Sequence, residues 1–155
     1  MRCVCTILWE VLNIGYYNNT KYSHDGISFR SKDEIFFWDY CKEKKAKGEI
    51  ENFEYEPETF TLIPKFNFAG RLIRAMTYCP DFKIYHHDGT VEYIEIKGFL
   101  TPEALLKVKL FRYHLYTTDN TVKYRLLSRN LKHAEIDGQW IEYENLKKKR
   151  RDAKK

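Results

Sequence analysis

Two acidic residues and one lysine near the middle of the chain have the types and spacing that a divalent-metal site requires. Residues 80–97 read PDFKIYHHDGTVEYIEIK and contain Asp81, Glu95 and Lys97. Two neighbouring carboxylates repel each other unless a cation lies between them, and a hard cation such as Mg²⁺ prefers oxygen ligands. Lys97 adds a further positive charge beside such a metal. The pattern therefore predicts a divalent-metal site on this stretch.

The register of a predicted β-hairpin decides whether these side chains meet. Strand-forming residues at 82–86 and 91–97 flank His87-Asp88-Gly89, which is a strong hairpin signal. With a three-residue loop, Asp81 lies opposite Glu95, and Lys97 follows on the same face. A two-residue loop would place the two carboxylates on opposite faces. The three-residue loop is favoured because it gathers the apolar side chains on the other face: Phe82, Ile84, Ile94 and Ile96.

A third carboxylate, Glu34, comes from a predicted helix over residues 32–47 that ends at Gly48. Ser31-x-x-Glu34 is a capping-box pattern, so Glu34 could serve only to cap this helix. However, Glu34 shares a helical face with Phe37 and Cys41, and that face must turn inward. The sequence leaves both roles open, the helix cap and a third metal ligand.

The remaining elements predict an α/β fold. We expect strands at 60–68 and 71–79 joined by a turn at Ala69-Gly70, and a loop at 51–57. A helix from Thr101-Pro102 to about Tyr116 and a core strand at 121–127 follow. A strand–helix–strand order allows a right-handed crossover, which predicts a mixed β-sheet flanked by helices, with the Asp81/Glu95 site near one sheet edge. Residues 1–17 fit a strand or a short helix, and residues 128–146 show no clear period.

Composition indicates a single globular domain at 1–146 and a basic tail at 147–155. The tail carries a net charge of +6 and the whole chain +5, which leaves the domain at −1. We expect the tail to be disordered and to attract DNA. The chain has no apolar run long enough to span a membrane and no signal peptide. The four cysteines (Cys3, Cys5, Cys41 and Cys79) lack zinc-site spacing, so we expect reduced thiols and a cytoplasmic protein.

Taken together, these motifs resemble the PD-(D/E)xK nucleases. The chain is similar to phage-encoded endonucleases related to the endonuclease I resolvases and to archaeal Holliday-junction resolvases. The resemblance covers residues 21–112, and four pieces carry it in order: Gly26-x-x-Phe29-x-Ser31-Lys32-x-Glu34, Tyr78-x-Pro80-Asp81-Phe82, Glu95-Ile96-Lys97-Gly98, and the run LKVKLF at 106–111.

The resemblance implies a restriction-endonuclease-like core and a Mg²⁺-dependent endonuclease, with Mn²⁺ able to substitute. It implies hydrolysis of phosphodiester bonds in branched DNA by a homodimeric Holliday-junction resolvase of DNA recombination, in a host-cell cytoplasm if phage-encoded. Glu34, Asp81, Glu95 and the carbonyl of Ile96 would hold the metal, and Lys97 would orient or activate the attacking water. We further expect cationic side chains to contact DNA: Lys107, Lys109, Lys147, Lys148, Lys149, Arg150 and Arg151.

Two other functions fit the same residues. One is a repair or restriction-type DNA nuclease with another structure preference. The other is a nucleic-acid-binding module that does not cut, although a complete set of Asp81, Glu95 and Lys97 argues against it. His86 and His87 lie at the hairpin tip and are interpreted as turn residues.

Overall fold

The computed structural model of the chain describes residues 21–154. The strand or helix expected at 1–17, Cys3 and Cys5 lie outside the described residues. Among residues 21–154, no helix is long and apolar enough to cross a lipid bilayer.

The centre of the fold is a five-stranded mixed sheet with the strand order β11-β10-β9-β8-β3. Its strands are β3 (Asn52–Tyr55), β8 (Phe82–Tyr85), β9 (Val91–Ile96), β10 (Lys123–Arg129) and β11 (Trp140–Glu142). Strands β9 and β10 are parallel, and the other neighbours are antiparallel. Helix α2 (Pro102–Thr118) makes the crossover between the two parallel strands. The predicted mixed sheet is confirmed.

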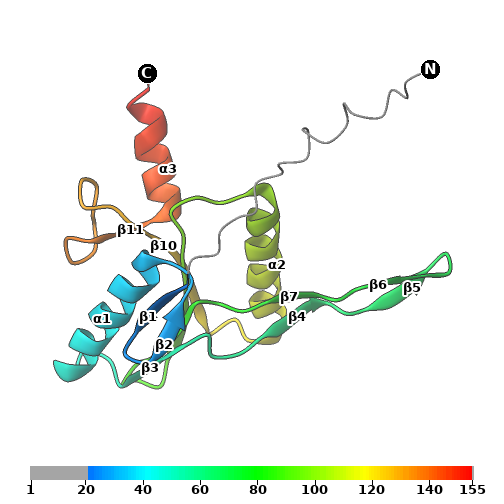
Figure 1. The fold of residues 1–155 in the computed structure, drawn as a ribbon, viewed down its shortest axis with the longest axis horizontal. Coiled ribbons are helices and arrows are strands. Elements are labelled where there is room, and N and C mark those ends of the chain that lie inside the picture. The colour runs from blue at the N-terminus through cyan, green and yellow to red at the C-terminus, as the bar shows by residue number, and fades with distance from the viewer. Residues whose placement is uncertain (1–20, 155) are drawn as a thin grey trace, which may run out of the picture.

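Helices α1 (Lys32–Ala46) and α2 pack on opposite faces of this sheet (Figure 1). Successive residues of a strand point to opposite faces. Accordingly, Ile94 joins the core beneath Phe37 of α1, whereas Tyr93 joins the core beneath Phe111 of α2. Because both faces of the central strands are covered, the architecture is the predicted α/β, restriction-endonuclease-like core.

The helix boundaries follow from local signals in the sequence. The Ser31 hydroxyl accepts a hydrogen bond from the amide of Glu34 and begins α1. Beyond the end of α1, Gly48 has a φ of +71°, a conformation that glycine adopts without strain. Thr101 caps α2 through the amide of Ala104, with Pro102 in the first turn. Both predicted helices are confirmed to within two residues at their ends.

The β8–β9 hairpin has the predicted register. Tyr85 pairs with Val91 and Phe82 with Ile94. The amide of His86 donates to the Thr90 carbonyl at 3.0 Å, and Gly89 closes the loop with a φ of +80°. Asp81 immediately precedes β8, and Glu95 lies near the end of β9.

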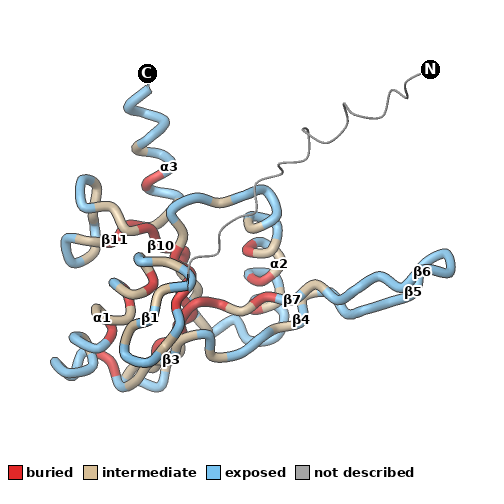
Figure 2. The backbone as a smooth tube through the Cα atoms, in the orientation of Figure 1, coloured by how far each residue is buried: buried red, intermediate tan, exposed pale blue. Residues whose placement is uncertain are grey.

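The strands predicted at 60–68 and 71–79 form an arm and not part of the central sheet. We call residues 60–78 the β-arm; it consists of β4 (Phe60–Ile63), β5 (Phe66–Phe68), β6 (Arg71–Ile73) and β7 (Met76–Tyr78). Within residues 21–154, β4 pairs only with β7, and β5 only with β6. Figure 1 shows the arm reaching away from the body, and Figure 2 shows that its outer part is exposed.

The sheet edge comes instead from β3, in the segment expected to be a loop. Phe53 and Tyr55 of β3 pack against the core beneath α1, and β3 pairs with β8. Strands β8 and β9 are therefore interior strands. Asp81 and Glu95 lie at the ends of these interior strands, one and two strands in from the edge strand β3.

A short hairpin and a helix lie near the two ends of the described residues. Strands β1 (Tyr22–His24) and β2 (Ile27–Phe29) form a hairpin beside α1. Helix α3 (Tyr143–Asp152) continues directly from β11. The expectation of a disordered tail was wrong for residues 147–152, which are helical. Buried Leu146 anchors the first turns of α3, and Lys and Arg extend a helix readily.

Candidate functional site

Asp81, Glu95 and Lys97 come together at the ends of β8 and β9. Nζ of Lys97 lies 2.8 Å from Oε1 of Glu95 and 3.6 Å from Oδ2 of Asp81. The hairpin register places these residues on one face, and that face turns toward α2. The two carboxylates are almost fully buried, with relative exposures of 1% for Asp81 and 5% for Glu95. The predicted acidic pair and its lysine are thus within contact distance.

Burial gives Asp81 an unusual protonation equilibrium. Loss of solvation, together with the nearby charges of Glu95 and Glu34, raises the pKa of Asp81 well above its ordinary value. Lys97 and the amide of Ile96 act in the opposite direction, and this amide donates to Oδ2 of Asp81 at 2.8 Å. The position of Asp81 is therefore fixed by the backbone, while its charge is only partly balanced.

Lys97 is the counter-charge of this pair. Burial alone would lower the pKa of Lys97, but the charges of Asp81 and Glu95 outweigh that effect and raise it. The backbone around Lys97 is held by β10, since its amide donates to the Leu127 carbonyl at 2.8 Å and its carbonyl accepts from the Ser128 hydroxyl. The backbone of Lys97 is therefore fixed beside β10, which keeps its ammonium group within reach of both carboxylates.

Glu34 does cap α1, and its charge also acts on Asp81 and Lys97. Its Oε1 accepts from the Ser31 hydroxyl at 2.9 Å, and its Oε2 accepts from the Arg30 amide at 3.0 Å. The Tyr55 hydroxyl donates to the same Oε2 at 2.7 Å. Glu34 is buried, and its charge raises the pKa of both Asp81 and Lys97. The cap is confirmed, while the role of metal ligand stays a prediction.

Tyr78 of β7 holds the second oxygen of Glu95. Its hydroxyl lies 2.8 Å from Oε2 of Glu95 and 2.9 Å from the Tyr124 hydroxyl. Burial, with the charge of Glu95, raises the pKa of Tyr78 far above its ordinary value, so this phenol stays protonated and donates. Glu95 is thus held on one oxygen by Lys97 and on the other by Tyr78.

A cavity of about 260 Å³ opens beside Glu95 and Lys97. Its wall carries three cationic side chains, Arg30, Lys97 and Lys107, against the single carboxylate of Glu95. The other lining residues are Thr77, Tyr78, Cys79 and Ala104. Arg30 is also paired with Glu56, and Lys107 with Glu103, both at the partly exposed rim, so a phosphate group of a polyanion would compete with these carboxylates for the two cations.

The donors present fit a hard divalent cation. Two buried carboxylates share one ammonium group, so the site carries an excess of negative charge that a metal would balance. Ile96 lies between Glu95 and Lys97 and is buried; its carbonyl as a further ligand stays a prediction. Lys97 contacts both carboxylates in this structure, so a metal held by them would take over part of the charge balance that Lys97 supplies.

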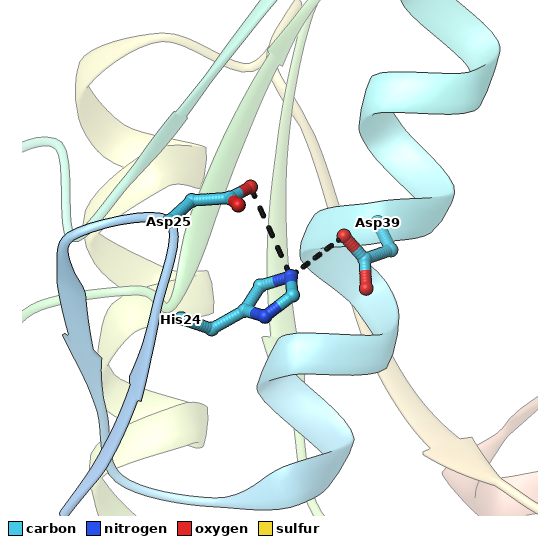
Figure 3. A group of neighbouring side chains, drawn as sticks. All are labelled: His24, Asp25 and Asp39. Atoms are coloured by element: carbon cyan, nitrogen blue, oxygen red, sulfur yellow. Dashed lines mark hydrogen bonds and ion pairs between the residues drawn. The ribbon is translucent and has the colours of Figure 1, made fainter.

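In residues 21–154, Glu34, Asp81 and Glu95 do not bring three ligand atoms within 4.8 Å of one another, whereas a different group of side chains does. His24, Asp25 and Asp39 place one ligand atom each within 4.8 Å of one another (Figure 3). Lys42 already contacts both carboxylates, at 2.5 Å from Asp25 and 3.0 Å from Asp39. All four side chains are at least one-third exposed. This arrangement is a surface ion-pair cluster beside α1 and carries no functional claim.

The predicted DNA-contacting residues divide into two places. Lys107 lines the cavity and pairs with Glu103 at 3.0 Å, whereas Lys109 is exposed on α2 outside it. On α3, a separate hollow of about 280 Å³ is lined by Tyr143, Lys147, Arg150, Arg151 and Lys154. Lys148 is exposed, and Lys149 pairs with Glu135 at 2.9 Å. The structure therefore joins only Lys107 to the carboxylates.

The hairpin histidines have structural contacts, in keeping with their interpretation as turn residues. Nε2 of His86 lies 3.3 Å from Glu92, and Nε2 of His87 lies 3.0 Å from the Gly48 carbonyl. Glu92 and His86 line an enclosed cavity of about 180 Å³ between α1 and the sheet. None of the three site carboxylates lines that cavity.

Sequence reasoning missed three contributors to the site. Arg30 precedes the helix cap and lines the cavity, and its position just before Ser31 was the available signal. Tyr78 was noted only as part of a motif, and its bond to Glu95 depends on the position of β7, which lies outside the central sheet. Tyr55 belongs to β3, which the sequence did not predict.

Comparison with known proteins identifies the family to which the chain belongs. A family model described as "Protein of unknown function (DUF1064)" matches residues 15–149, which is most of the chain. No curated protein matches the chain.

Proposed function

We propose that this chain, which belongs to the DUF1064 family, is a Mg²⁺-dependent endodeoxyribonuclease that hydrolyses phosphodiester bonds in branched DNA. The contact of Lys97 with both Asp81 and Glu95, beside a cavity with two more cationic side chains, is the observation that carries this proposal. The likeness of the motif order to Holliday-junction resolvases supports the choice of a four-way junction as substrate.

Each residue has a distinct task in this proposal. Asp81 and Glu95, with Glu34 and the Ile96 carbonyl, hold Mg²⁺ or Mn²⁺, and a bound metal lowers the pKa of water and neutralises charge on the phosphate. Lys97, next to both carboxylates, orients or activates the attacking water at the cavity wall. Tyr78 keeps one oxygen of Glu95 engaged, which limits the directions in which that carboxylate can turn.

The cationic side chains of the cavity receive the substrate backbone. Arg30 and Lys107 face the same space as Glu95, so a phosphate placed there meets positive charge on both sides. The cations of α3, including Lys147, Arg150 and Arg151, add long-range attraction to DNA from a separate surface. A homodimer in the cytoplasm would supply the paired cuts that a four-way junction requires.

A panel of DNA structures tests the activity. Purified protein with Mg²⁺ is offered duplex, nicked, flap and four-way substrates, and we expect cleavage with preference for the four-way junction. Asp81→Ala should abolish cleavage, whereas Asp88→Ala, at the exposed tip of the same hairpin, should not. Undiminished cleavage by Asp81→Ala would show that this site is not the catalytic one.

The same panel separates the alternative functions. Preference for nicked or duplex DNA would indicate a repair or restriction-type nuclease with the same site. Binding without any cleavage, in Mg²⁺ and in Mn²⁺, would indicate a non-catalytic nucleic-acid-binding module. Sedimentation of the protein with and without DNA tests the proposed homodimer.

A further inference from the structure

The outer part of the β-arm, residues 64–75, carries exposed apolar side chains that pack against nothing in the described part of the chain. All six residues of β5 and β6 are exposed, including Phe68 at 70% and Leu72 at 63%. A two-stranded ribbon without a packed apolar face is only marginally stable alone, and clustered exposed apolar side chains mark interaction sites. The outer arm therefore has the character of a binding element.

We propose that the outer arm contacts duplex DNA and lies in a groove of the duplex that flanks the cleavage site. The proposal rests on the proposed nuclease function and adds a second contact surface to it, at a distance from the carboxylates. A two-stranded β-ribbon is narrow enough to enter the major groove, and apolar side chains can wedge against base steps in the minor groove.

The charge of the β-arm favours a polyanion as its binding partner. Residues 59–80 contain Lys65, Arg71 and Arg74 and no Asp or Glu, although residues 1–146 as a whole have a net charge of −1. The arm, which projects from the body (Figure 1), therefore carries positive charge with no acidic side chain of its own. Lys65 and Arg74 flank the paired residues at the base of the outer arm, and Arg71 lies beside the tip.

The arm's geometry presents these groups on both faces of a two-stranded ribbon. Ala69 and Gly70 both have positive φ, at 48° and 75°, which forms the tight two-residue turn that matches strand twist. Phe68 pairs with Arg71 and Phe66 with Ile73, so these four share one face. A cation beside aromatic rings is suited to a phosphate and the neighbouring base or sugar at once.

The arm begins at the catalytic cavity, which gives it a defined position on the substrate. Thr77 and Tyr78 of β7 line that cavity, and the same strand leads out to β6. From Ile63 to Ala69 the arm extends by about 20 Å at roughly 3.3 Å per residue. That length corresponds to about six base pairs at roughly 3.4 Å each.

A second copy of this chain is the competing partner for the same surface. Two arms laid side by side would bring six cations together with no carboxylate from either arm to pair with them. Repulsion between these cations would therefore oppose self-association through the outer arm, whereas DNA would neutralise their charge. We accordingly place the dimer contact of the proposed nuclease elsewhere.

The experiment compares DNA binding by two variants in the non-cleaving Asp81→Asn background. The arm variant is Lys65→Ala, Arg71→Ala, Arg74→Ala. The control variant, Lys45→Ala, Lys47→Ala, Lys123→Ala, removes the same charge from exposed positions away from the carboxylates. Binding is measured between 0.05 and 0.2 M salt on junctions whose duplex branches are about 4 or about 15 base pairs long. Circular dichroism and sedimentation check the fold and the mass of each variant.

On junctions with long branches, the arm variant loses three phosphate contacts, which should make the slope of log K against log salt shallower by about 2.7. Between 0.05 and 0.2 M salt, the affinity of the arm variant should therefore fall about 40-fold less than that of the Asp81→Asn parent. With short branches, the arm and control variants should bind alike. Equal slopes on long branches would overturn the proposal, and so would a loss of dimer mass in the arm variant, which would assign the arm to a second copy. Cleavage by the wild-type protein is scored separately, so the nuclease proposal and the arm proposal can fail independently.

Discussion

The hydroxyl of Tyr78 and Oε2 of Glu95 are 2.8 Å apart, while Nζ of Lys97 lies the same distance from Oε1. A buried carboxylate with a donor on each oxygen has a fixed orientation. The donor on Oε2 comes from the β-arm, and the donor on Oε1 comes from the sheet. The base of the arm is thus mechanically joined to the candidate catalytic centre.

Tyr78→Phe should reduce cleavage about tenfold or more and cost about 1 kcal/mol of unfolding free energy, because one buried hydrogen bond to a carboxylate is lost. Cleavage rate at saturating Mg²⁺ and urea denaturation measure the two effects. Tyr113→Phe is the control, since Tyr113 is exposed on α2 and its ring lies outside the site. Unchanged cleavage by Tyr78→Phe would mean that Glu95 needs no support on this oxygen.

Asp81→Asn should stabilise the metal-free protein at neutral pH. The pKa of Asp81 is raised in the folded state, so folding is favoured while the group is protonated and this contribution is lost as pH rises through the folded pKa. Asn cannot ionise and avoids that loss. In EDTA, we expect the advantage of Asp81→Asn to be absent near pH 4 and to grow with pH. A gain of about 1 kcal/mol near pH 7 would raise Tm by about 2–4 °C. An advantage independent of pH would contradict the prediction.

Lys97→Gln should destabilise the metal-free protein, because it leaves two buried carboxylates without their shared cation. Breaking a buried ion pair costs about 3–5 kcal/mol, and the 28% exposure of the Lys97 side chain reduces the expected cost to about 2 kcal/mol. Mg²⁺ should recover much of this stability without restoring cleavage. Urea denaturation with and without Mg²⁺ checks the prediction; a variant that Mg²⁺ does not stabilise would argue against metal binding by these carboxylates.

The variant Glu34→Gln distinguishes the helix-capping role of Glu34 from a role as metal ligand. The amide oxygen of Gln can accept from Arg30 and Tyr55, and its amide group can donate to the Ser31 hydroxyl, so the cap should survive at a cost below about 1 kcal/mol. If Glu34 binds the metal, cleavage should fall at least tenfold and half-saturation should need more Mg²⁺. Asp33→Asn changes the same charge one residue away and serves as the control. A wild-type rate in Glu34→Gln would leave Glu34 with the cap alone.

The parts of the fold that could be predicted are those set by local sequence. Alternation of apolar residues and the loop at Gly89 determine the β8–β9 register, and Ser31 and Thr101 begin their helices through contacts three residues away. The proximity of Asp81, Glu95 and Lys97 follows from that register alone. For this reason the centre of the candidate site was accessible from sequence.

What could not be predicted depends on contacts between distant segments. Strand β3 has only four residues, in a segment rich in Glu, and is specified by pairing with β8 and by packing of Phe53 and Tyr55 under α1. The β-arm has ordinary strand signals, and nothing local distinguishes strands that leave the body from strands that join the sheet. Arg30 lies just before α1, and Lys107 lies in α2. Both line the same cavity only because α1 and α2 pack on opposite sides of one sheet.

The exposed arm should make this protein susceptible to proteolysis at one defined segment. Trypsin cuts after lysine and arginine, and Lys65, Arg71 and Arg74 lie on an element with little packing to resist local opening. A single cut there separates α1 and β3 from the remaining sheet strands in the chain, yet β3 stays paired with β8 in the fold. The two fragments should therefore migrate together in native conditions and apart in denaturant. The rate of that cut, followed as DNA is added, reports whether the arm is covered.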